Sequence, residues 1–158
     1  MVRRIEQDAR VEPLSGDLLA IAQTHALDAS TFPRASLPQV LAVPGTAPFV
    51  WIARAEKGGP VVGFCVTEQR GPRLDITHIG VAPEHRGVGL GRALLRAALA
   101  SARARRATDV ILHVSTGNRA AIALYESEGF EVVRRIRAFY PFREFPDGGD
   151  AYVMLRRA

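Results

Sequence analysis

The feature that most constrains this chain is a glycine-rich segment, Arg86-Gly87-Val88-Gly89-Leu90-Gly91. A strand-like run, Leu74 to Val81, precedes it, and a strongly helical run, Arg92 to Arg106, follows it. A glycine-rich turn before a helix start aims several backbone N–H groups at one point, where the positive end of the helix dipole adds to them. Such a point binds phosphate. A plain tight turn would have the same pattern, so the rest of the chain must decide between the two.

Two common phosphate-binding motifs do not fit this segment. A P-loop needs a Lys-Ser/Thr pair after its last glycine, but Gly91 is followed by Arg92 and Ala93. A dinucleotide fingerprint needs Gly-x-Gly-x-x-Gly and an acidic residue at the end of the second strand. Here the three glycines are spaced two apart, and the next strand ends in His-Val-Ser at 113–115. The remaining pattern is Arg-x-x-Gly-x-Gly at a helix start.

Length and composition predict a single globular domain over residues 1–158, because 158 residues with 47% apolar content suit one core. No apolar run approaches the roughly 20 residues that span a bilayer, and the basic start leads into Glu6 and Asp8 rather than an apolar segment. Cys65 is the only cysteine and lies in the apolar run Val61 to Val66. We therefore expect a cytoplasmic protein without a membrane association, in which Cys65 is a reduced core residue rather than a nucleophile.

Charge and histidine content limit the classes of ligand and partner that fit this chain. The net charge of +5 comes from scattered arginines without an interleaved aromatic set, which makes nucleic acid an unfavoured partner. A mild positive field also suits a ligand with several phosphates. Four histidines without ligand spacing argue against a metal site. The oligomeric state stays open between monomer and homodimer.

Hydrophobic periodicity and turn residues predict an α/β domain with a mixed sheet. The expected helices are 16–27, 92–106 and about 118–128, with room for a second short helix in the loop after the first. The expected strands are 9–14, 48–56, 60–69, 74–81, 109–114, 130–139 and 151–156. The order is β-α-(α)-β-β-β-α-β-α-β-β.

This order, with Arg86-x-x-Gly89-x-Gly91 between the third central strand and its helix, resembles the GNAT superfamily of acetyl-CoA-dependent N-acetyltransferases. A second block supports the resemblance: Asn118 at a helix start, Tyr125 seven residues later, and Gly129-Phe130 at the helix end. The likeness covers roughly residues 9–155. It implies a mostly antiparallel central sheet of about seven strands flanked by about four helices, and an acyltransferase with acetyl-CoA as co-substrate.

Within the superfamily the chain is most similar to the protein N-terminal amine acetyltransferases, including the ribosomal-protein-alanine type. Phe32-Pro33 looks like their substrate loop, and Phe139-Tyr140-Pro141 looks like the start of their closing hairpin. The resemblance therefore implies that the acceptor is the α-amine of a protein or peptide N-terminus. It also implies that Phe32, Pro33 and Tyr140 contact this acceptor.

The resemblance divides the cofactor site into three parts. The N–H groups of the glycine-rich segment would hold the diphosphate, with Arg86 acting through its guanidinium or through its main chain. The strand backbone at 79–81 would pair with the pantetheine arm and polarise the thioester carbonyl. Asn118 has two candidate roles, a helix N-cap and a cofactor contact. The implied cofactor residues are Ile79, Gly80, Val81, Arg86, Gly87, Val88, Gly89, Leu90, Gly91, Asn118 and Tyr125.

The candidate general acid is Tyr125, which would hydrogen-bond the CoA sulfur and protonate it as the C–S bond breaks. Without the resemblance, Tyr125 would be interpreted as a core aromatic residue. The candidate general base is His113, at a position where the ribosomal-alanine enzymes usually carry Glu. Strand alternation turns His113 away from Leu112 and Val114, so it is either the base or a polar residue on a solvated face.

Asp75 is a second candidate base. Strict alternation places Asp75, Thr77 and Ile79 on one face of their strand, and Leu74, Ile76 and His78 on the other. A β-bulge in this strand would change that assignment.

Two other functions remain compatible with the sequence. The chain would acetylate a small-molecule amine, such as a polyamine, an amino acid or an antibiotic, or it would be a non-catalytic acyl-CoA-binding module. Acetylation of a protein or peptide α-amine is the leading hypothesis. The sequence does not identify the acceptor or the acyl-chain length.

Overall fold

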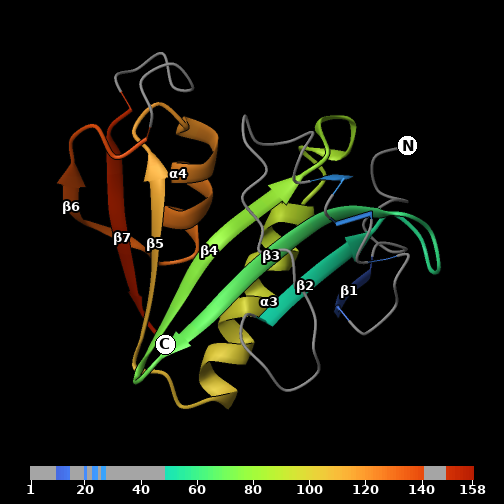
Figure 1. Ribbon diagram of the computed structural model, residues 1–158, viewed down its shortest axis with the longest axis horizontal. Helices are drawn as coiled ribbons and strands as arrows, with labels where there is room; N and C mark the ends of the chain where they lie inside the picture. The colour runs from blue at the N-terminus through green and yellow to red at the C-terminus, as the bar shows by residue number, and fades with distance from the viewer. Residues whose placement is uncertain (1–9, 15–19, 21–22, 25, 28–48, 141–148) are drawn as a thin grey trace.

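The computed structural model describes residues 10–14, 20, 23–24, 26–27, 49–140 and 149–158. Its strands form one seven-stranded sheet in the order β1-β2-β3-β4-β5-β7-β6 (Figure 1). The strands are β1 (Arg10–Pro13), β2 (Phe49–Arg54), β3 (Val61–Arg70), β4 (Arg73–Val81), β5 (Asp109–Ser115), β6 (Glu131–Ile136) and β7 (Ala151–Arg157). The other elements are a 3₁₀ turn, η1 (Pro83–His85), and the helices α3 (Leu90–Ala104) and α4 (Arg119–Ser127).

The sheet is mixed and mostly antiparallel, as predicted. Every neighbouring pair runs antiparallel except β4 and β5, which are parallel. The expected strand over 130–139 is shorter than predicted, because β6 ends at Ile136 and the chain then turns. The helices expected between residues 16 and 47 lie largely outside the described residues.

The parallel pair β4–β5 is short, and this shapes the whole molecule. The two strands are in register from Arg73↔Asp109 to Ile76↔Leu112 and no further. Beyond that point they diverge toward their C-terminal ends, with α4 beside the opening (Figure 1). The divergence begins at a β-bulge in β4, where Thr77 is an extra residue between the pairs Val66↔His78 and Thr67↔Ile76. A bulge bends and twists its strand, which is consistent with β4 turning away from β5 there.

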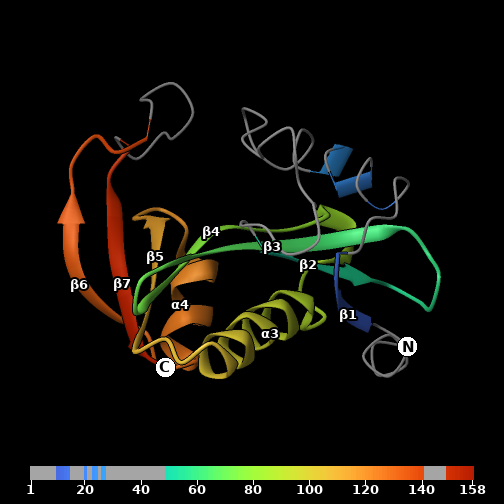
Figure 2. The ribbon, with the colours of Figure 1, turned by 60° about the horizontal axis from the view of Figure 1, so that its bottom comes forward.

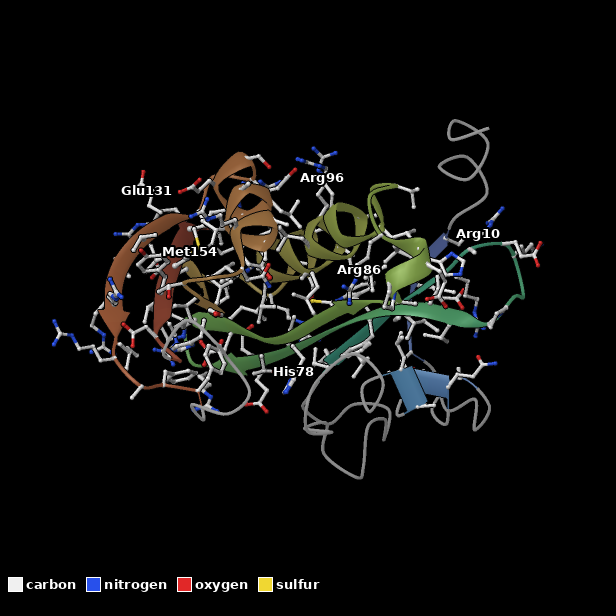
Figure 3. All side chains as sticks on the ribbon, turned by 90° about the horizontal axis from the view of Figure 1, so that it is seen from above. Arg10, His78, Arg86, Arg96, Glu131 and Met154 are labelled. Carbon is white, nitrogen blue, oxygen red and sulfur yellow. The ribbon has the colours of Figure 1, made fainter. Side chains whose placement is uncertain are left out.

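The bulge also corrects the alternation expected for β4. Ile79 and Val81 pack against the same core cluster as Leu74 and Ile76, so the prediction that placed Ile79 beside Asp75 was wrong. His78 lies on the opposite side of the sheet, away from α3 and α4 (Figure 3). One inserted residue reverses every side chain after it, because side chains alternate with a period of two.

The helices α3 and α4 cover one face of the sheet (Figure 2). Apolar periodicity predicts one buried stripe on α3, and the structure confirms it. The stripe consists of Leu90, Leu94, Leu95, Ala98, Leu99 and Ala102. Cys65 is fully buried beneath these helices, and burial raises the pKa of its thiol to about 12. A thiol with such a pKa is a poor nucleophile, so the core assignment of Cys65 is confirmed.

Among the described helices, none combines the length and the apolarity that a bilayer crossing needs.

The C-terminal end of α4 is closed by a Schellman motif. Gly129 has the left-handed conformation expected from the sequence, with φ +86°. The N–H of Phe130 donates to the carbonyl oxygen of Tyr125 at 3.0 Å, and the N–H of Gly129 donates to that of Glu126 at 3.0 Å. The rings of Tyr125 and Phe130 then meet edge to face with centroids 5.9 Å apart. This motif fixes the Tyr125 side chain in the core.

An ion-pair cluster joins α4 to α3. Helix periodicity predicts outward-facing Arg92 and Arg96, and both side chains are exposed. It also predicts a solvent-facing Glu128, but the Glu128 side chain is only 10% exposed and accepts from both arginines. The Glu128 Oε1 atom lies 2.5 Å from Arg92 Nη1 and 3.0 Å from Arg96 Nη2. The hydrogen bond from Arg96 is the main cause that lowers the pKa of the Glu128 carboxyl, and the Arg92 hydrogen bond adds to it.

We expect Glu128→Gln to lower the free energy of unfolding at pH 7 by about 1 kcal/mol, because the variant loses the charge that holds two exposed arginines. The carboxyl has a lowered pKa in the folded state, so its contribution is complete above the ordinary value of 4.5 and is lost as the pH falls through the lowered pKa. Urea unfolding at a series of pH values measures this.

The matched control is Glu126→Gln, on the exposed surface of the same helix. This change should have little effect at any pH. A Glu128→Gln deficit that persists unchanged at low pH would show that packing rather than charge links the helices.

Candidate active site

The glycine-rich segment forms an open loop at the N-terminus of α3. Gly87 and Gly89 have φ values of +76° and +91°, a backbone region that L side chains adopt only with strain. Gly89 is the N-cap residue of α3 and supplies no side-chain cap hydrogen bond. The N–H groups of the first helical turn are therefore left for water or a ligand. This geometry is compatible with an anion at the helix start, and phosphate binding by the loop stays a prediction.

Arg86 ties this loop to the end of β4. Its Nε donates to the carbonyl oxygen of Val81 at 2.8 Å, while the side chain as a whole stays exposed. The contact orders the segment between the strand and the helix. Arg86 thus supports the loop structurally, and a direct contact with a phosphate stays a prediction.

Gly91 differs from the other two glycines of the loop. It has no positive φ, and a Cβ atom there would meet Leu124 Cδ2 at 3.5 Å and Val81 Cγ2 at 4.0 Å. These are ordinary contact distances, so the fold itself does not require glycine at this position. The position faces the space between the end of β4 and α4.

The outer half of β4 has one free edge. β3 pairs with it through Val81, but on its other side no strand of the described chain is in register beyond Ile76. Arg86 already contacts the Val81 carbonyl oxygen at this edge. The rest of the edge at 79–81 is available to an extended ligand arm, which would add to the sheet as a strand does. The side chains of Ile79 and Val81 pack against the core, as expected.

Tyr125 and Asn118 lie on α4, beside the divergence of β4 and β5. Asn118 Oδ1 accepts from the N–H of Ala121 at 3.2 Å, so its predicted N-cap role is confirmed. A contact of Asn118 with a cofactor stays a prediction. The Tyr125 side chain is 4% exposed, and burial raises the pKa of its phenol, with smaller contributions from Cys65 and Tyr140. The phenol therefore stays protonated at neutral pH and retains a proton to donate.

His113 lies on β5 and points away from the helices, as alternation predicted: Leu112 and Val114 are buried and His113 is exposed. Its imidazole stacks on the ring of Phe139, with centroids 4.8 Å apart and an interplanar angle of 6°. Partial burial lowers the pKa of His113, as do Arg134 and Arg73, while Asp75 opposes them. The imidazole is therefore neutral at pH 7.

Asp75 is engaged by two arginines. Its Oδ1 lies 2.6 Å from Arg73 Nε, and its Oδ2 lies 3.3 Å from Arg70 Nε. Transfer of a proton to this carboxylate would remove the charge that both guanidinium groups contact. Asp75 therefore suits an electrostatic role near His113 better than the role of base that the sequence left open.

Three further residues were predicted to contact the acceptor: Phe32, Pro33 and Tyr140. Phe32 and Pro33 lie outside the described residues. Tyr140 is partly buried, burial raises the pKa of its phenol, and its ring meets Phe139 edge to face at 4.9 Å. Phe139 was expected only as part of the closing hairpin, yet it connects His113 with Tyr140. The sequence signal for this connection is two adjacent aromatic residues after a strand.

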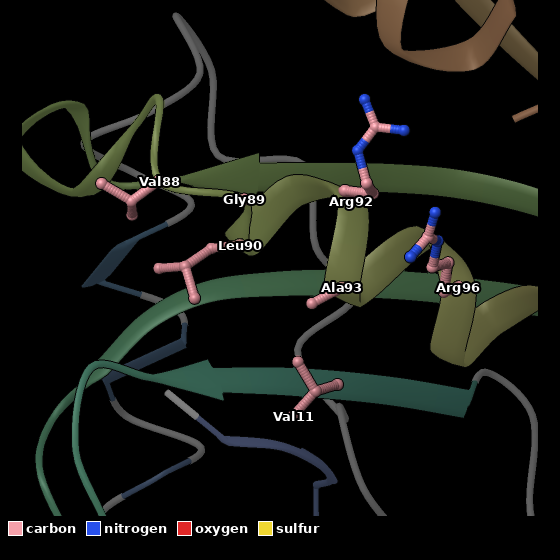
Figure 4. Close-up of a pocket in the computed structure, with 7 residues that line it drawn as sticks. All are labelled: Val11, Val88, Gly89, Leu90, Arg92, Ala93 and Arg96. Atoms are coloured by element: carbon pink, nitrogen blue, oxygen red, sulfur yellow. The ribbon is translucent and has the colours of Figure 1, made fainter. Parts of the chain in front are cut away.

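A cavity of about 350 Å³ opens at the start of α3, on the side of β1. Figure 4 shows the Arg92 side chain at its rim pointing away from Val11. The cavity is lined by Val11, Val88, Gly89, Leu90, Arg92, Ala93 and Arg96. It adjoins the glycine loop, but Tyr125 and His113 do not line it, so it is no candidate for the reaction centre.

Comparison with known proteins gives matches over most of the chain. Residues 19–130 match the acetyltransferase (GNAT) family. A mycothiol acetyltransferase of Thermobispora bispora is 46% identical over 83 residues, which are 48% of this chain and 28% of that protein. The N-alpha-acetyltransferase RimI of Mycobacterium tuberculosis is 40% identical over 106 residues, which are 65% of this chain and 63% of that protein.

Solved structures of other proteins superpose on nearly the whole of this chain. The ribosomal-protein-S18-alanine N-acetyltransferase of Escherichia coli superposes with a TM-score of 0.79 and 25% identity, over 94% of this chain and 93% of that one. Arabidopsis thaliana Naa50, solved with the bisubstrate analogue CoA-Ac-MVNAL, gives a TM-score of 0.74 at 24% identity, over 92% of this chain and 97% of that one, which shows a shared fold.

The matched segments span 28% and 63% of the two curated relatives, so these matches concern a shared domain rather than the relatives' full length. The family match, in contrast, covers more than half of this chain and includes the glycine loop, the diverging strands and α4. The chain therefore belongs to the acetyltransferase (GNAT) family, whose enzymes use acetyl-CoA as co-substrate.

Proposed function

We propose that this protein is an acetyl-CoA-dependent N-acetyltransferase that acetylates the α-amine of a protein or peptide N-terminus. The observation that carries the proposal is the divergence of β4 from β5 after Ile76↔Leu112. It places the glycine loop, a free β4 edge and α4 with its buried Tyr125 around one opening. A diphosphate at the loop and an extended arm along β4 would bring a thioester toward Tyr125.

The reaction is a direct transfer. The neutral amine attacks the thioester carbonyl carbon, a C–N bond forms and the C–S bond breaks. N–H groups at 79–81 would polarise the carbonyl oxygen. The amine proton goes to His113, directly or through water, and the leaving thiolate takes a proton from Tyr125. The products are an acetylated amine and free CoA.

Burial favours the neutral form of both proposed proton-transfer groups, which moves their pKa values in opposite directions. Burial keeps Tyr125 protonated, whereas partial burial and two arginines keep His113 neutral and able to accept a proton. Pairs of titratable groups whose pKa values are moved apart by their surroundings are typical of acid–base sites.

The acceptor class is supported by the relatives that act on protein N-termini by name, the RimI of M. tuberculosis and the alanine N-acetyltransferase of E. coli. The mycothiol acetyltransferase match favours a second candidate, a small-molecule acceptor. Release of free thiol from acetyl-CoA with a peptide library, compared with a panel of small amines, separates the two. Turnover of small amines alone would contradict the peptide proposal.

Tyr125→Phe should lower kcat by about 100-fold or more, because general acid catalysis typically contributes at least this factor. The dissociation constant for acetyl-CoA should change little, since the ring and its packing remain. Thiol release and titration calorimetry measure the two quantities. Tyr152→Phe is the control, since Tyr152 packs against the same core cluster. Equal losses of turnover and affinity in Tyr125→Phe would indicate a structural tyrosine.

The pH dependence distinguishes His113 from Asp75 as the base. The base must be neutral to accept a proton, so kcat/KM should rise with pH through the pKa of His113, which lies below its ordinary value of 6.5. His113→Gln should remove this acidic limb and lower kcat/KM at least about tenfold.

Asp75→Asn should retain activity and move the midpoint of the same limb to lower pH, because the Asp75 charge raises the pKa of His113. Loss of activity in Asp75→Asn together with a normal profile in His113→Gln would instead assign the base to Asp75.

Gly89→Leu should abolish acetyl-CoA binding, because a side chain there would displace the phosphates from the backbone N–H groups. Gly58→Leu is a matched control: Gly58 has a similar φ of +75°, a Cβ atom added there would meet nothing within 4 Å, and it lies between β2 and β3. Both variants should lose about 1–2 kcal/mol of stability to backbone strain. Calorimetry that shows retained binding in Gly89→Leu would refute the loop assignment.

A further inference from the structure

The turn between β6 and Phe139 is held in a strained conformation. Ala138 has φ +49°, in the left-handed region that non-glycine residues rarely adopt. Its N–H donates to Asp150 Oδ1 at 3.0 Å, and the other oxygen of this carboxylate lies 2.7 Å from Arg135 Nη2. Strain of this kind persists only where the surroundings fix the backbone, and it is frequent at functional sites. Here the Asp150 carboxylate fixes it.

The other side of Phe139 is fixed as well. The N–H of Tyr140 donates to the carbonyl oxygen of Gly149 at 2.8 Å. Gly149 has φ +70°, and a Cβ atom there would collide with the carbonyl oxygen of Tyr140. The hairpin neck therefore requires glycine at 149, and Phe139 is held between two anchored residues.

These two contacts together set the position of the Phe139 ring. Phe139 lies parallel to the imidazole of His113, with an interplanar angle of 6°. The Phe139 side chain is nevertheless 44% exposed, so burial of the ring in the core does not explain the arrangement. What the ring does cover is one face of His113.

We propose that Phe139 is a positioning residue for the base: the clamped Ala138 turn holds its ring flat against His113, which shields one imidazole face from water and sets the plane of the ring. The proposal rests on the proposed role of His113. A shielded imidazole disfavours its charged form, so the stack keeps the base neutral to lower pH. The turn is thus part of the acid–base site.

Charged groups on β4 and β6 also act on His113. Arg73 and Asp75 come from β4 and act in opposite directions, and Arg134 comes from β6 and disfavours the imidazolium. Tyr140 adjoins Phe139 as a neutral phenol. None of these groups changes in the variants below, so they form a constant background to the effect of the stack.

NMR titration of the His113 imidazole in the full chain, without acetyl-CoA or acceptor, tests the proposal. Phe139→Leu should raise the pKa of His113 by about half a unit or more, toward its ordinary value. Phe139→Tyr preserves a stacked ring and should leave the pKa unchanged. Because Phe139 is 44% exposed and belongs to neither core cluster, neither change should unfold the protein.

Two further variants test whether the contact of Asp150 with the Ala138 turn holds Phe139 in place. Asp150→Ala releases the turn and should raise the pKa of His113. Removal of a negative charge cannot by itself raise the pKa of an imidazole, so a rise identifies the stack as the cause. Ala138→Gly adopts φ +49° without strain and should leave the pKa unchanged. No rise in Phe139→Leu, or a fall in Asp150→Ala, would overturn the proposal.

The acidic limb of kcat/KM should shift upward in Phe139→Leu by the same amount as the pKa. A pKa that moves while the limb does not would overturn the positioning role. This outcome is distinguishable from failure of the proposed function, which His113→Gln tests separately: a retained acidic limb in His113→Gln would remove His113 as the base whatever the titration shows.

Discussion

The site depends on the limited length of the parallel pair between β4 and β5. Four residue pairs hold the two strands together, and the Thr77 bulge then turns β4 away. Had the pairing continued to Val81, the β4 edge would be satisfied by β5 and no extended ligand could join it. A backbone edge left unpaired inside a domain carries a cost unless water or a ligand satisfies it. The divergence of the two strands therefore creates an unpaired backbone edge that an extended ligand would satisfy.

The two helices beside this opening are coupled to each other. The glycine loop begins α3, and Tyr125 lies in the last two turns of α4. Glu128 joins α4 to the first turns of α3 through two arginines, and the Schellman motif locks Tyr125 against Phe130. These contacts keep the distance between the glycine loop and the phenol constant. A fixed distance matters because a ligand anchored at one end presents its reactive group at a set position along its length.

Sequence reasoning succeeded where the determining interactions are local. The Asn118 cap, the αL residue Gly129 and the buried stripe of α3 are set by residues close together in the sequence. It failed where two distant segments decide the outcome. The Thr77 bulge depends on register with β3, and the Glu128 cluster depends on how two helices pack. The Phe139–His113 stack depends on a hairpin neck closed by Asp150, twelve residues after Ala138.

The two faces of the sheet carry different groups of the candidate site. The helices α3 and α4 cover one face (Figure 2), and Tyr125 of α4 packs into the core on that side. His113 lies on the opposite face, part of which packs against Ala20 and Leu27. A thioester reaching through the opening between β4 and β5 would be approached from the His113 side by the amine and from the Tyr125 side by the proton for sulfur. In this arrangement Tyr125 and His113, the proposed acid and base, would act from opposite faces of the sheet, so neither would transfer its proton directly to the other.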